Sequence, residues 1–261
     1  MDLGISGRSA LVCASTSGLG YAIALQLARE GVRVVINGRN SKRVDQAVAR
    51  ILDSGGDAVG IAADLTEPGA PQELVARARA AVGDIDIVVL NSGGPAPAPA
   101  MAVDNDGVSA AVDLLLRPQI AVIRQLLPQM RERRWGRILA IGSSGIQAPL
   151  PDLALSNLGR GALAGYLKTL AGEVAGDGVN VNLILPGRID TDRVRSLDAQ
   201  TGERLGTSAD AVRADVIATI PANRYGESEE FGAAGAFLCS AQAGYITGIA
   251  LRVDGGAVQC L

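Results

Sequence analysis

The sequence has no histidine, and this absence excludes several kinds of active site. A Ser-His-Asp hydrolase, a Cys-His nucleophile pair and a zinc site with imidazole ligands all need a ring nitrogen that the chain does not have. Cysteine is also scarce, because Cys13, Cys239 and Cys260 are too few and too scattered for a thiolate metal cage or a disulfide framework. We therefore expect no metal site, and we interpret the cysteines as small core or surface thiols in a reducing compartment.

Long hydrophobic runs and an excess of positive charge are missing too. No stretch has the roughly eighteen consecutive apolar residues that a membrane span requires, and the start of the chain lacks the basic-then-apolar pattern of an export signal. The net charge is -3, and the one dense basic cluster, at 131–134, contains Glu132. Such a chain has no strongly basic surface that would attract the phosphates of a nucleic acid. The composition predicts a cytoplasmic protein that binds neither a membrane nor nucleic acid.

The chain does have short β-branched or leucine-rich runs that alternate with amphipathic segments of helix length. The predicted strands are 9–14, 32–36, 58–62, 85–90, 137–141, 179–185 and 249–253. Repeated strand-helix-strand units predict a mostly parallel sheet with helices on both faces. We therefore expect an α/β fold, a doubly wound Rossmann sheet of about seven strands, with residues 1–261 forming a single dinucleotide-binding domain.

Two irregular segments interrupt this pattern. The Pro/Ala tract at 95–100 follows the fourth predicted strand, and it is either a plain loop or one wall of a pocket at the carboxyl ends of the strands. Residues 188–215 are rich in Arg, Asp, Ser and Gly, and loops of that length in a compact domain are often lids. We predict a substrate lid at 188–215.

A glycine-containing turn joins the first predicted strand to a helix-forming segment. Gly18 and Gly20 let the backbone turn sharply and approach a pyrophosphate, which would then lie on the free amides at the positive end of the helix. The position of the turn, between a first strand and a helix, favours a dinucleotide site. The candidate cofactor contacts here are Ser15, Ser17, Gly18, Leu19 and Gly20.

The end of the second predicted strand bears on which dinucleotide binds. Gly38 stands where an NAD-selective site usually places an acid for the ribose 2′-hydroxyl, and Arg39 follows it. An arginine at that corner can bind a 2′-phosphate, so the sequence favours NADP over NAD. The alternative is a solvated arginine at the start of a helix. Asp64 and Leu65, at the end of the third predicted strand, are placed to flank the adenine ring.

Five further segments follow the turn in a consistent order. They are Asn91-Ser92-Gly93-Gly94, Ser143, Pro186-Gly187-Arg188-Ile189-Asp190-Thr191, Tyr245-Ile246-Thr247-Gly248 and Val253-Asp254-Gly255-Gly256. Together with the turn, they resemble the short-chain dehydrogenase/reductase family over nearly the whole chain, and in particular its 3-oxoacyl-carrier-protein-reductase-like branch. The resemblance implies a nicotinamide cofactor and hydride transfer to or from a carbonyl group.

The resemblance also assigns roles to individual residues. It implies cofactor contacts for Asn91, Gly93, Arg160, Pro186, Gly187, Ile189 and Thr191. Ser143 stands where the family has its strand-five serine, and it either polarises a substrate oxygen or merely ends a strand.

The chain departs from the family at three of the four catalytic positions. Family members carry Tyr-x-x-x-Lys thirteen residues past the serine, but counting from Ser143 gives Ser156 and Arg160. Leu115 stands where the family places an asparagine in the preceding long helix. Because they are spaced by four, Ser156 and Arg160 share one helix face.

The altered pair has different chemistry from a tyrosine and a lysine. The hydroxyl of Ser156 reaches less far than a phenol, and its pKa is too high for efficient proton donation near neutrality. Arg160 stays charged, so it can hold ribose hydroxyls or stabilise a developing oxyanion, but it is a poor proton donor. Asp152, Asp190 and Asp192 are either relays for a proton through water or ordinary capping and solvated acids.

Three functions remain open from the sequence. The leading interpretation is an NADP-dependent oxidoreductase acting on a small carbonyl or alcohol, with catalytic residues Ser143, Ser156 and Arg160 and a proton from water or substrate. The second is a lyase, dehydratase or isomerase that keeps the nucleotide as a structural or redox-neutral element. The third is a non-catalytic NADP-binding module.

Small residues in the helix that carries Ser156 suggest that the protein associates with further copies of itself. Gly161, Ala162, Ala164 and Gly165 suit a close approach between helices, and members of the resembled family commonly associate through this region. We therefore expect a homo-dimer or homo-tetramer.

Overall fold

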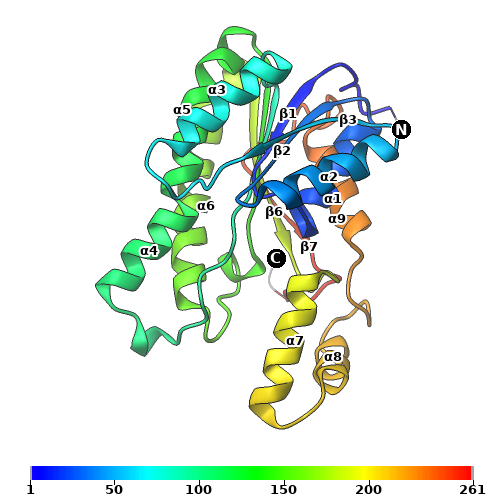
Figure 1. Ribbon diagram of the computed structural model, residues 1–261. Coiled ribbons are helices and arrows are strands. Elements are labelled where there is room, and N and C mark those ends of the chain that lie inside the picture. The colour runs from blue at the N-terminus through cyan, green and yellow to red at the C-terminus, as the bar shows by residue number, and fades with distance from the viewer. Residues whose placement is uncertain (1, 260–261) are drawn as a thin grey trace.

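A parallel sheet forms the centre of the protein (Figure 1). The computed structural model describes residues 2–259, and within them the seven strands lie in the order β3-β2-β1-β4-β5-β6-β7. Every neighbouring pair is parallel. The strands are β1 Ser9–Val12, β2 Arg33–Gly38, β3 Asp57–Ala62, β4 Ile87–Leu90, β5 Gly136–Ile141, β6 Val179–Pro186 and β7 Ala250–Val253. The predicted doubly wound sheet is confirmed, and each predicted strand differs from the observed one by only one or two residues at either end.

The strand order places a topological switch point beside β1. The chain first builds outwards from β1 to β2 and β3, and it then returns to place β4 on the other side of β1. The turn after β1 and the turn after β4 therefore leave the sheet in opposite directions. In open α/β sheets, ligands bind in the crevice at such a point, outside the carboxyl ends of the strands.

Helices cover both faces of the sheet. They are α1 Gly18–Arg29, α2 Ser41–Asp53, α3 Ala70–Val82, α4 Asn105–Leu115, α5 Arg117–Glu132, α6 Ala154–Val174, α7 Asp192–Leu205, α8 Ala209–Ala218 and α9 Ser228–Leu238. Helices α1, α2 and α9 lie on one side, and α3, α5 and α6 lie on the other (Figure 1). Short 3₁₀ turns occupy Ala100–Ala102, Ser144–Ile146 and Ala175–Asp177.

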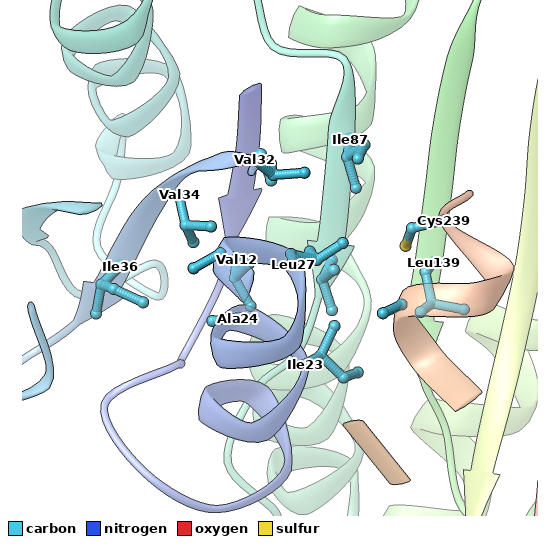
Figure 2. Close-up of a cluster of buried hydrophobic side chains, with 14 of the residues drawn as sticks. Val12, Ile23, Ala24, Leu27, Val32, Val34, Ile36, Ile87, Leu139 and Cys239 are labelled. Atoms are coloured by element: carbon cyan, nitrogen blue, oxygen red, sulfur yellow. The ribbon is translucent and has the colours of Figure 1, made fainter. Parts of the chain in front are cut away.

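Alternation along the strands divides the core into two clusters. In β1, Ala10 and Val12 belong to the cluster under α1 and α9, whereas Leu11 and the following Cys13 belong to the cluster on the other face. This is the period of two that a strand imposes on its side chains. Figure 2 shows the first cluster, in which Ile23 and Leu27 of α1 meet the strand side chains. Both clusters are built mainly from buried aliphatic side chains, so the sheet is a rigid support for whatever lies at its edge.

The segment predicted as an irregular lid at 188–215 is mostly helical, so that part of the prediction is wrong. Thr191 accepts a hydrogen bond from the Val194 amide and begins α7, and Ser208 caps α8 in the same way. Between them, Gly206 adopts a left-handed φ of 69° and ends α7. The α7–α8 pair projects from the end of the sheet (Figure 1). None of the helices within residues 2–259 has the length and apolarity needed to cross a bilayer.

Two glycines allow α1 and α9 to pack closely. A Cβ on Gly232 would lie 2.6 Å from the Ala22 carbonyl oxygen, and one on Gly235 would lie 2.6 Å from Ile23 Cγ1. Both glycines are buried. The close approach of these helices therefore depends on the absence of side chains at two positions of α9.

We predict that Gly232→Ala destabilises the protein by about 1–3 kcal/mol, because overpacking against backbone outweighs the gain in helix propensity. Gly172→Ala in α6 is the matched control, since a Cβ there meets nothing within 4 Å. The control should stabilise the helix by up to about 1 kcal/mol. Urea denaturation followed by circular dichroism measures both free energies of unfolding. Equal stabilisation by the two substitutions would contradict the packing described here.

Candidate active site

The turn after β1 has the geometry of an anion cradle. Ala14 has φ 45° and Gly18 has φ 59°, so the backbone reverses sharply before α1. A Cβ on Gly20 would lie 2.8 Å from the Ala14 carbonyl oxygen and 2.9 Å from Asn91 Nδ2, so only glycine fits there. Helix α1 begins with no side-chain cap and no acid in its first turn. Its first amides are thus free for a ligand, and the residues of the turn fit a dinucleotide diphosphate.

The two serines of this turn have different surroundings. Ser15 is fully buried, and its hydroxyl donates to the Val12 carbonyl at 2.6 Å and accepts from the Asn37 amide at 3.1 Å. Its own amide donates to the Asn37 carbonyl. Ser15 therefore supports the turn from below. Ser17 is exposed at the start of α1 and its side chain caps nothing, so it is open to a ligand, and Leu19 is half-buried against the core.

An asparagine that the sequence interpretation passed over fixes the shape of the turn. Asn37, at the end of β2, accepts a hydrogen bond from the Ala14 amide at 3.3 Å. Its Nδ2 donates to the carbonyls of Ile61 and Ala63, each at 3.2 Å. The signal in the sequence was a single amide at the end of an otherwise apolar run. Its place beside the turn follows only from the pairing of β1, β2 and β3.

The end of β4 lies directly beside this turn. Asn91 donates from Nδ2 to the Ala14 carbonyl at 3.0 Å, and its own carbonyl accepts from Gln119 Nε2 at 3.3 Å. Gly93 has open space where a Cβ would be, so a ligand can approach the backbone there. The structure therefore brings Asn91 and Gly93 to the same crevice as the turn after β1.

The ends of β2 and β3 form the corner where a 2′-phosphate would lie. A Cβ on Gly38 would lie 2.5 Å from Thr16 Cγ2, which leaves little room for an acid at this position. The Arg39 side chain is 80% exposed and lies 3.7 Å from Asp64. Burial tends to raise the pKa of Asp64, but hydrogen bonds from Thr66 and the charge of Arg39 lower it overall.

Leu65 lies at the same corner, where it is half-buried and packs on the core cluster of Leu11. The structure thus gathers Arg39, Asp64 and Leu65 where the sequence expected them, at the ends of two adjacent strands.

Two of the residues expected to be catalytic, Ser143 and Arg160, lie at the end of β5. The Ser143 hydroxyl accepts a hydrogen bond from the Gly145 amide at 3.1 Å, which leaves its own proton free to donate. Arg160 Nη1 donates to the Ile141 carbonyl at 3.0 Å and to the Gly142 carbonyl at 3.3 Å. Burial and the nearby charge of Arg193 lower the pKa of Arg160 to about 10, which still leaves it protonated at neutral pH.

Ser156 lies one turn before Arg160 on the same face of α6 and is half-buried. The Pro/Ala tract is fastened to the start of this helix, because the Ala98 amide donates to the Asp152 carbonyl at 2.7 Å and the Ala98 carbonyl accepts from the Ala154 amide at 3.2 Å. The tract therefore stands beside Ser156, which favours its interpretation as a wall of the pocket.

Leucine at position 115 changes the packing behind this site. The buried Leu115 fills the space beside Gly159 of α6, where a Cβ would lie 2.6 Å from Leu115 Cδ1. Tyr166, further along α6, packs against the core cluster of Leu11. The contact between α4 and α6 is therefore apolar at the position where the family has an asparagine.

The segment after β6 completes the crevice. Gly187 donates to the Val253 carbonyl at 2.9 Å, and a Cβ on it would lie 2.6 Å from Asp254 Cα. Ile189 is buried, and Pro186 ends β6. Thr191 begins α7, and its Cγ2 lies 3.9 Å from the position of a Cβ on Gly18. Thr191 therefore faces the turn after β1 from the opposite side.

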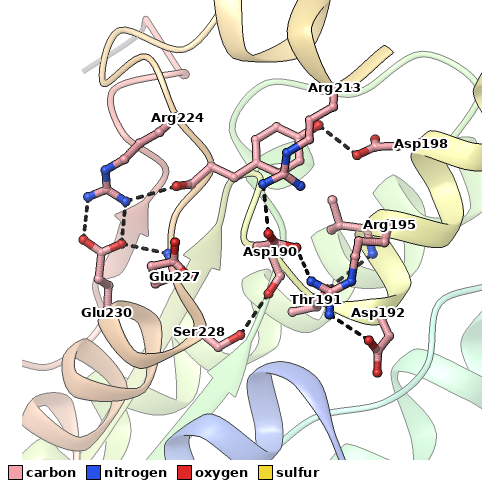
Figure 3. A network of polar contacts seen from close by, with 12 residues as sticks. Asp190, Thr191, Asp192, Arg195, Asp198, Arg213, Arg224, Glu227, Ser228 and Glu230 are labelled. Carbon is pink, nitrogen blue, oxygen red and sulfur yellow. Dashed lines mark hydrogen bonds and ion pairs between the residues drawn. The ribbon is translucent and has the colours of Figure 1, made fainter. Parts of the chain in front are cut away.

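Asp190 and Asp192 are engaged in ion pairs (Figure 3). Asp190 accepts from Arg213 at 2.8 Å and from Arg195 at 2.5 Å, and Arg195 also pairs with Asp192 at 2.8 Å. The hydrogen bond from Arg213 and the charges of both arginines hold the pKa of Asp190 below its usual value. Asp190 is therefore an ionised acceptor with a structural task, and the geometry gives no support to a role in proton relay.

The chain is similar to known proteins over nearly its whole length. Residues 13–258 match the family model described as enoyl-(acyl carrier protein) reductase. The 3-oxoacyl-[acyl-carrier-protein] reductase FabG of Escherichia coli (strain K12) is 33% identical over 260 residues, which cover 97% of this chain and 98% of that protein. The chain belongs to the short-chain dehydrogenase/reductase family.

Other members of the short-chain dehydrogenase/reductase family agree with this assignment. The dehydrogenase/reductase SDR family member 4 of Bos taurus is 33% identical over 259 residues, covering 98% of this chain and 89% of that protein. The L-sorbose reductase of Gluconobacter frateurii, solved with NADPH and L-sorbose, superposes with a TM-score of 0.94 at 31% identity and full coverage of both chains. YwfH, an NADPH-dependent reductase involved in bacilysin biosynthesis, superposes with a TM-score of 0.92 at 26% identity, covering 97% of this chain and 99% of that one.

We predict that Arg39 contributes to the binding of NADPH in this short-chain dehydrogenase/reductase. Arg39→Ala should weaken NADPH binding about tenfold at low salt and leave NADH binding unchanged, because a charge-assisted hydrogen bond to the 2′-phosphate is lost at an exposed site. Arg43→Ala is the matched control, because Arg43 is also an exposed arginine and lies nearby, in the first turn of α2. Titration calorimetry gives all the dissociation constants. An equal loss for both nucleotides would show that Arg39 does not read the 2′-phosphate.

Proposed function

We propose that this short-chain dehydrogenase/reductase is an NADP-dependent oxidoreductase that transfers a hydride between the nicotinamide and a small carbonyl or alcohol substrate. The observation that carries this proposal is the start of α1, which lies at the switch point and has neither a side-chain cap nor an acid in its first turn. Ser143 and Arg160 lie further along the same sheet edge, at the end of β5. A dinucleotide that lies on α1 extends along the strand ends towards these two residues. The sorbose reductase complex with NADPH and the NADPH-dependent YwfH support the choice of cofactor.

The protein's own residues supply the polar environment of the reaction. The nicotinamide, when bound, supplies or accepts the hydride at the substrate carbon. Ser143 is held by the Gly145 amide, and it donates its free proton in a hydrogen bond to the substrate oxygen. Arg160, held on the end of β5, stabilises negative charge that develops on that oxygen. Both groups are positioned before the substrate arrives, so little reorganisation is required.

The proton comes from a different source than a tyrosine. The pKa of a serine hydroxyl is far above neutrality, so Ser156 orients the substrate or a water molecule and does not itself supply the proton. Arg160 keeps its proton at neutral pH, since its pKa is about 10. Asp190 is ionised and paired. We therefore assign the proton to water that enters beside Ser156, below a cover formed by α7 and α8 within 188–215.

Hydride transfer is tested with NADPH deuterated at C4 and a panel of carbonyl compounds. We predict loss of absorbance at 340 nm and deuterium in the product alcohol, with kcat lowered about 100-fold in Ser143→Ala because one hydrogen-bond donor to the oxygen is lost. NADPH affinity should stay unchanged. Ser144→Ala is the matched control, because no hydrogen bond of its hydroxyl is part of the site.

The same experiment separates the alternatives. Product without deuterium and without net change in NADPH would indicate a lyase, dehydratase or isomerase. Tight binding of NADPH with no turnover across the panel would indicate a non-catalytic module. The relatives named above are reductases, which favours the redox reaction.

We also propose a homo-dimer or homo-tetramer that associates through α6. A Cβ on Gly161 or on Gly165 would meet nothing within 4 Å, so this side of the helix is open for a second copy. Light scattering at micromolar concentration should show a dimer or a tetramer, and Gly165→Arg should dissociate it because a long charged side chain prevents close approach. A monomeric wild-type protein would contradict this assembly.

A further inference from the structure

Arg193 reaches across the carboxyl edge of the sheet. It lies in the first turn of α7, which follows β6, yet its guanidinium contacts the backbone that follows β4. A Cβ on Gly94 would lie 2.6 Å from Arg193 Nη2 and 3.3 Å from its Cζ. Because β5 lies between β4 and β6, Arg193 passes over the end of the strand that carries Ser143. The absence of a side chain at Gly94 makes room for this guanidinium.

Arg193 and Arg160 place two positive charges in the same space. Arg160 is held at the end of β5 by two carbonyls, and burial together with the charge of Arg193 lowers its pKa. A cation in the first turn of a helix is also unfavourable, since the helix dipole is positive there. The arrangement therefore costs stability until an anion is present.

Three arginines near the start of α7 are neutralised by acids, and Arg193 is not. Arg195 pairs with Asp190 and Asp192, Arg213 pairs with Asp190, and Arg188 pairs with Asp198. Within residues 2–259, Arg193 has no carboxylate within ion-pair distance. An exposed, unpaired arginine that faces a second cation in a crevice is a candidate for binding an anionic ligand.

The position of Arg160 and Arg193 indicates that they would contact the substrate and not the diphosphate of the cofactor. The diphosphate would lie on the start of α1, at the end of β1, where Thr191 Cγ2 lies 3.9 Å from the position of a Cβ on Gly18. Neighbouring strands are about 4.8 Å apart, so the end of β5 lies roughly 10 Å along the sheet edge from that point. Arg160 and Arg193 thus face the reacting end of the crevice.

We propose that Arg193 binds a carboxylate of the substrate, with Arg160 adding to the positive potential, and that the substrate is therefore an oxo acid or the corresponding hydroxy acid. Ser143 directly follows Gly142, whose carbonyl holds Arg160, and the charge of Arg193 acts on Arg160, so we place the substrate carbonyl oxygen near the carboxylate. This favours 2-oxo and 3-oxo acids over longer ones. The proposal rests on the oxidoreductase function proposed above.

The test compares short-chain 2-oxo and 3-oxo acids with their methyl esters, which keep the carbonyl group and lose the charge. Arg193→Met should raise KM for the acids about 10-fold to 100-fold, because a bidentate charge-assisted pair is lost, and should leave KM for the esters unchanged. Arg193→Lys should restore part of the affinity. Arg204→Met is the matched control, an exposed arginine in the last turn of the same helix.

Binding measurements make the test independent of turnover. Calorimetry of the acids against the NADP⁺ complex should show binding to wild type and to Arg204→Met, and weak binding to Arg193→Met. Equal affinity of wild type for acids and esters would overturn the proposal. So would a loss of NADPH affinity in Arg193→Met with acid binding unchanged, since the anion would then be the diphosphate. Turnover of esters alone would leave the oxidoreductase function standing, whereas binding of acids without any hydride transfer would contradict that function and not the carboxylate site.

Discussion

The buried side-chain amide of Asn37 holds together the three strand ends on which the site is built. It accepts from the Ala14 amide, which begins the turn after β1, and it donates to two carbonyls at the end of β3. A buried amide without partners costs about 1–3 kcal/mol, so these strand ends are stable only in this mutual arrangement. Ala14 has a left-handed φ, and its carbonyl in turn accepts from Asn91 at the end of β4. The crevice is thus preorganised by the sheet before any nucleotide binds.

Helix α6 keeps the position of a catalytic element while its chemistry has changed. Ser156 and Arg160 still face the end of β5, but Arg160 is fastened to two backbone carbonyls and remains charged. In the proposed function, such a site would bind and polarise a substrate oxygen without donating a proton from a side chain. On the same proposals, positive charge would take over part of the role of an acidic hydroxyl, and the crevice would select ligands that bring negative charge.

Much of this arrangement was predictable from the sequence, because strand periodicity and glycine placement are local signals. The seven strands, the turn at Gly18 and Gly20, and the meeting of Arg39 with Asp64 follow from parallel strands that end at one edge. The helices α7 and α8 were not predicted, because the segment is rich in charged residues and Thr191 and Ser208 were not recognised as their N-caps. The contact of Arg193 with Gly94 was not predictable, since it depends on the direction in which a whole helix leaves the sheet.

The contact between Leu115 and Gly159 fixes how closely α4 approaches the helix that carries Ser156 and Arg160. A Cβ on Gly159 would lie 2.6 Å from Leu115 Cδ1, so a larger residue at position 159 would push the two helices apart. Gly159 directly precedes Arg160, whose guanidinium is held by two carbonyls at the end of β5. An apolar contact between two helices thus sets where a positive charge lies, and a change of side-chain volume at either position would be felt as a displaced cation.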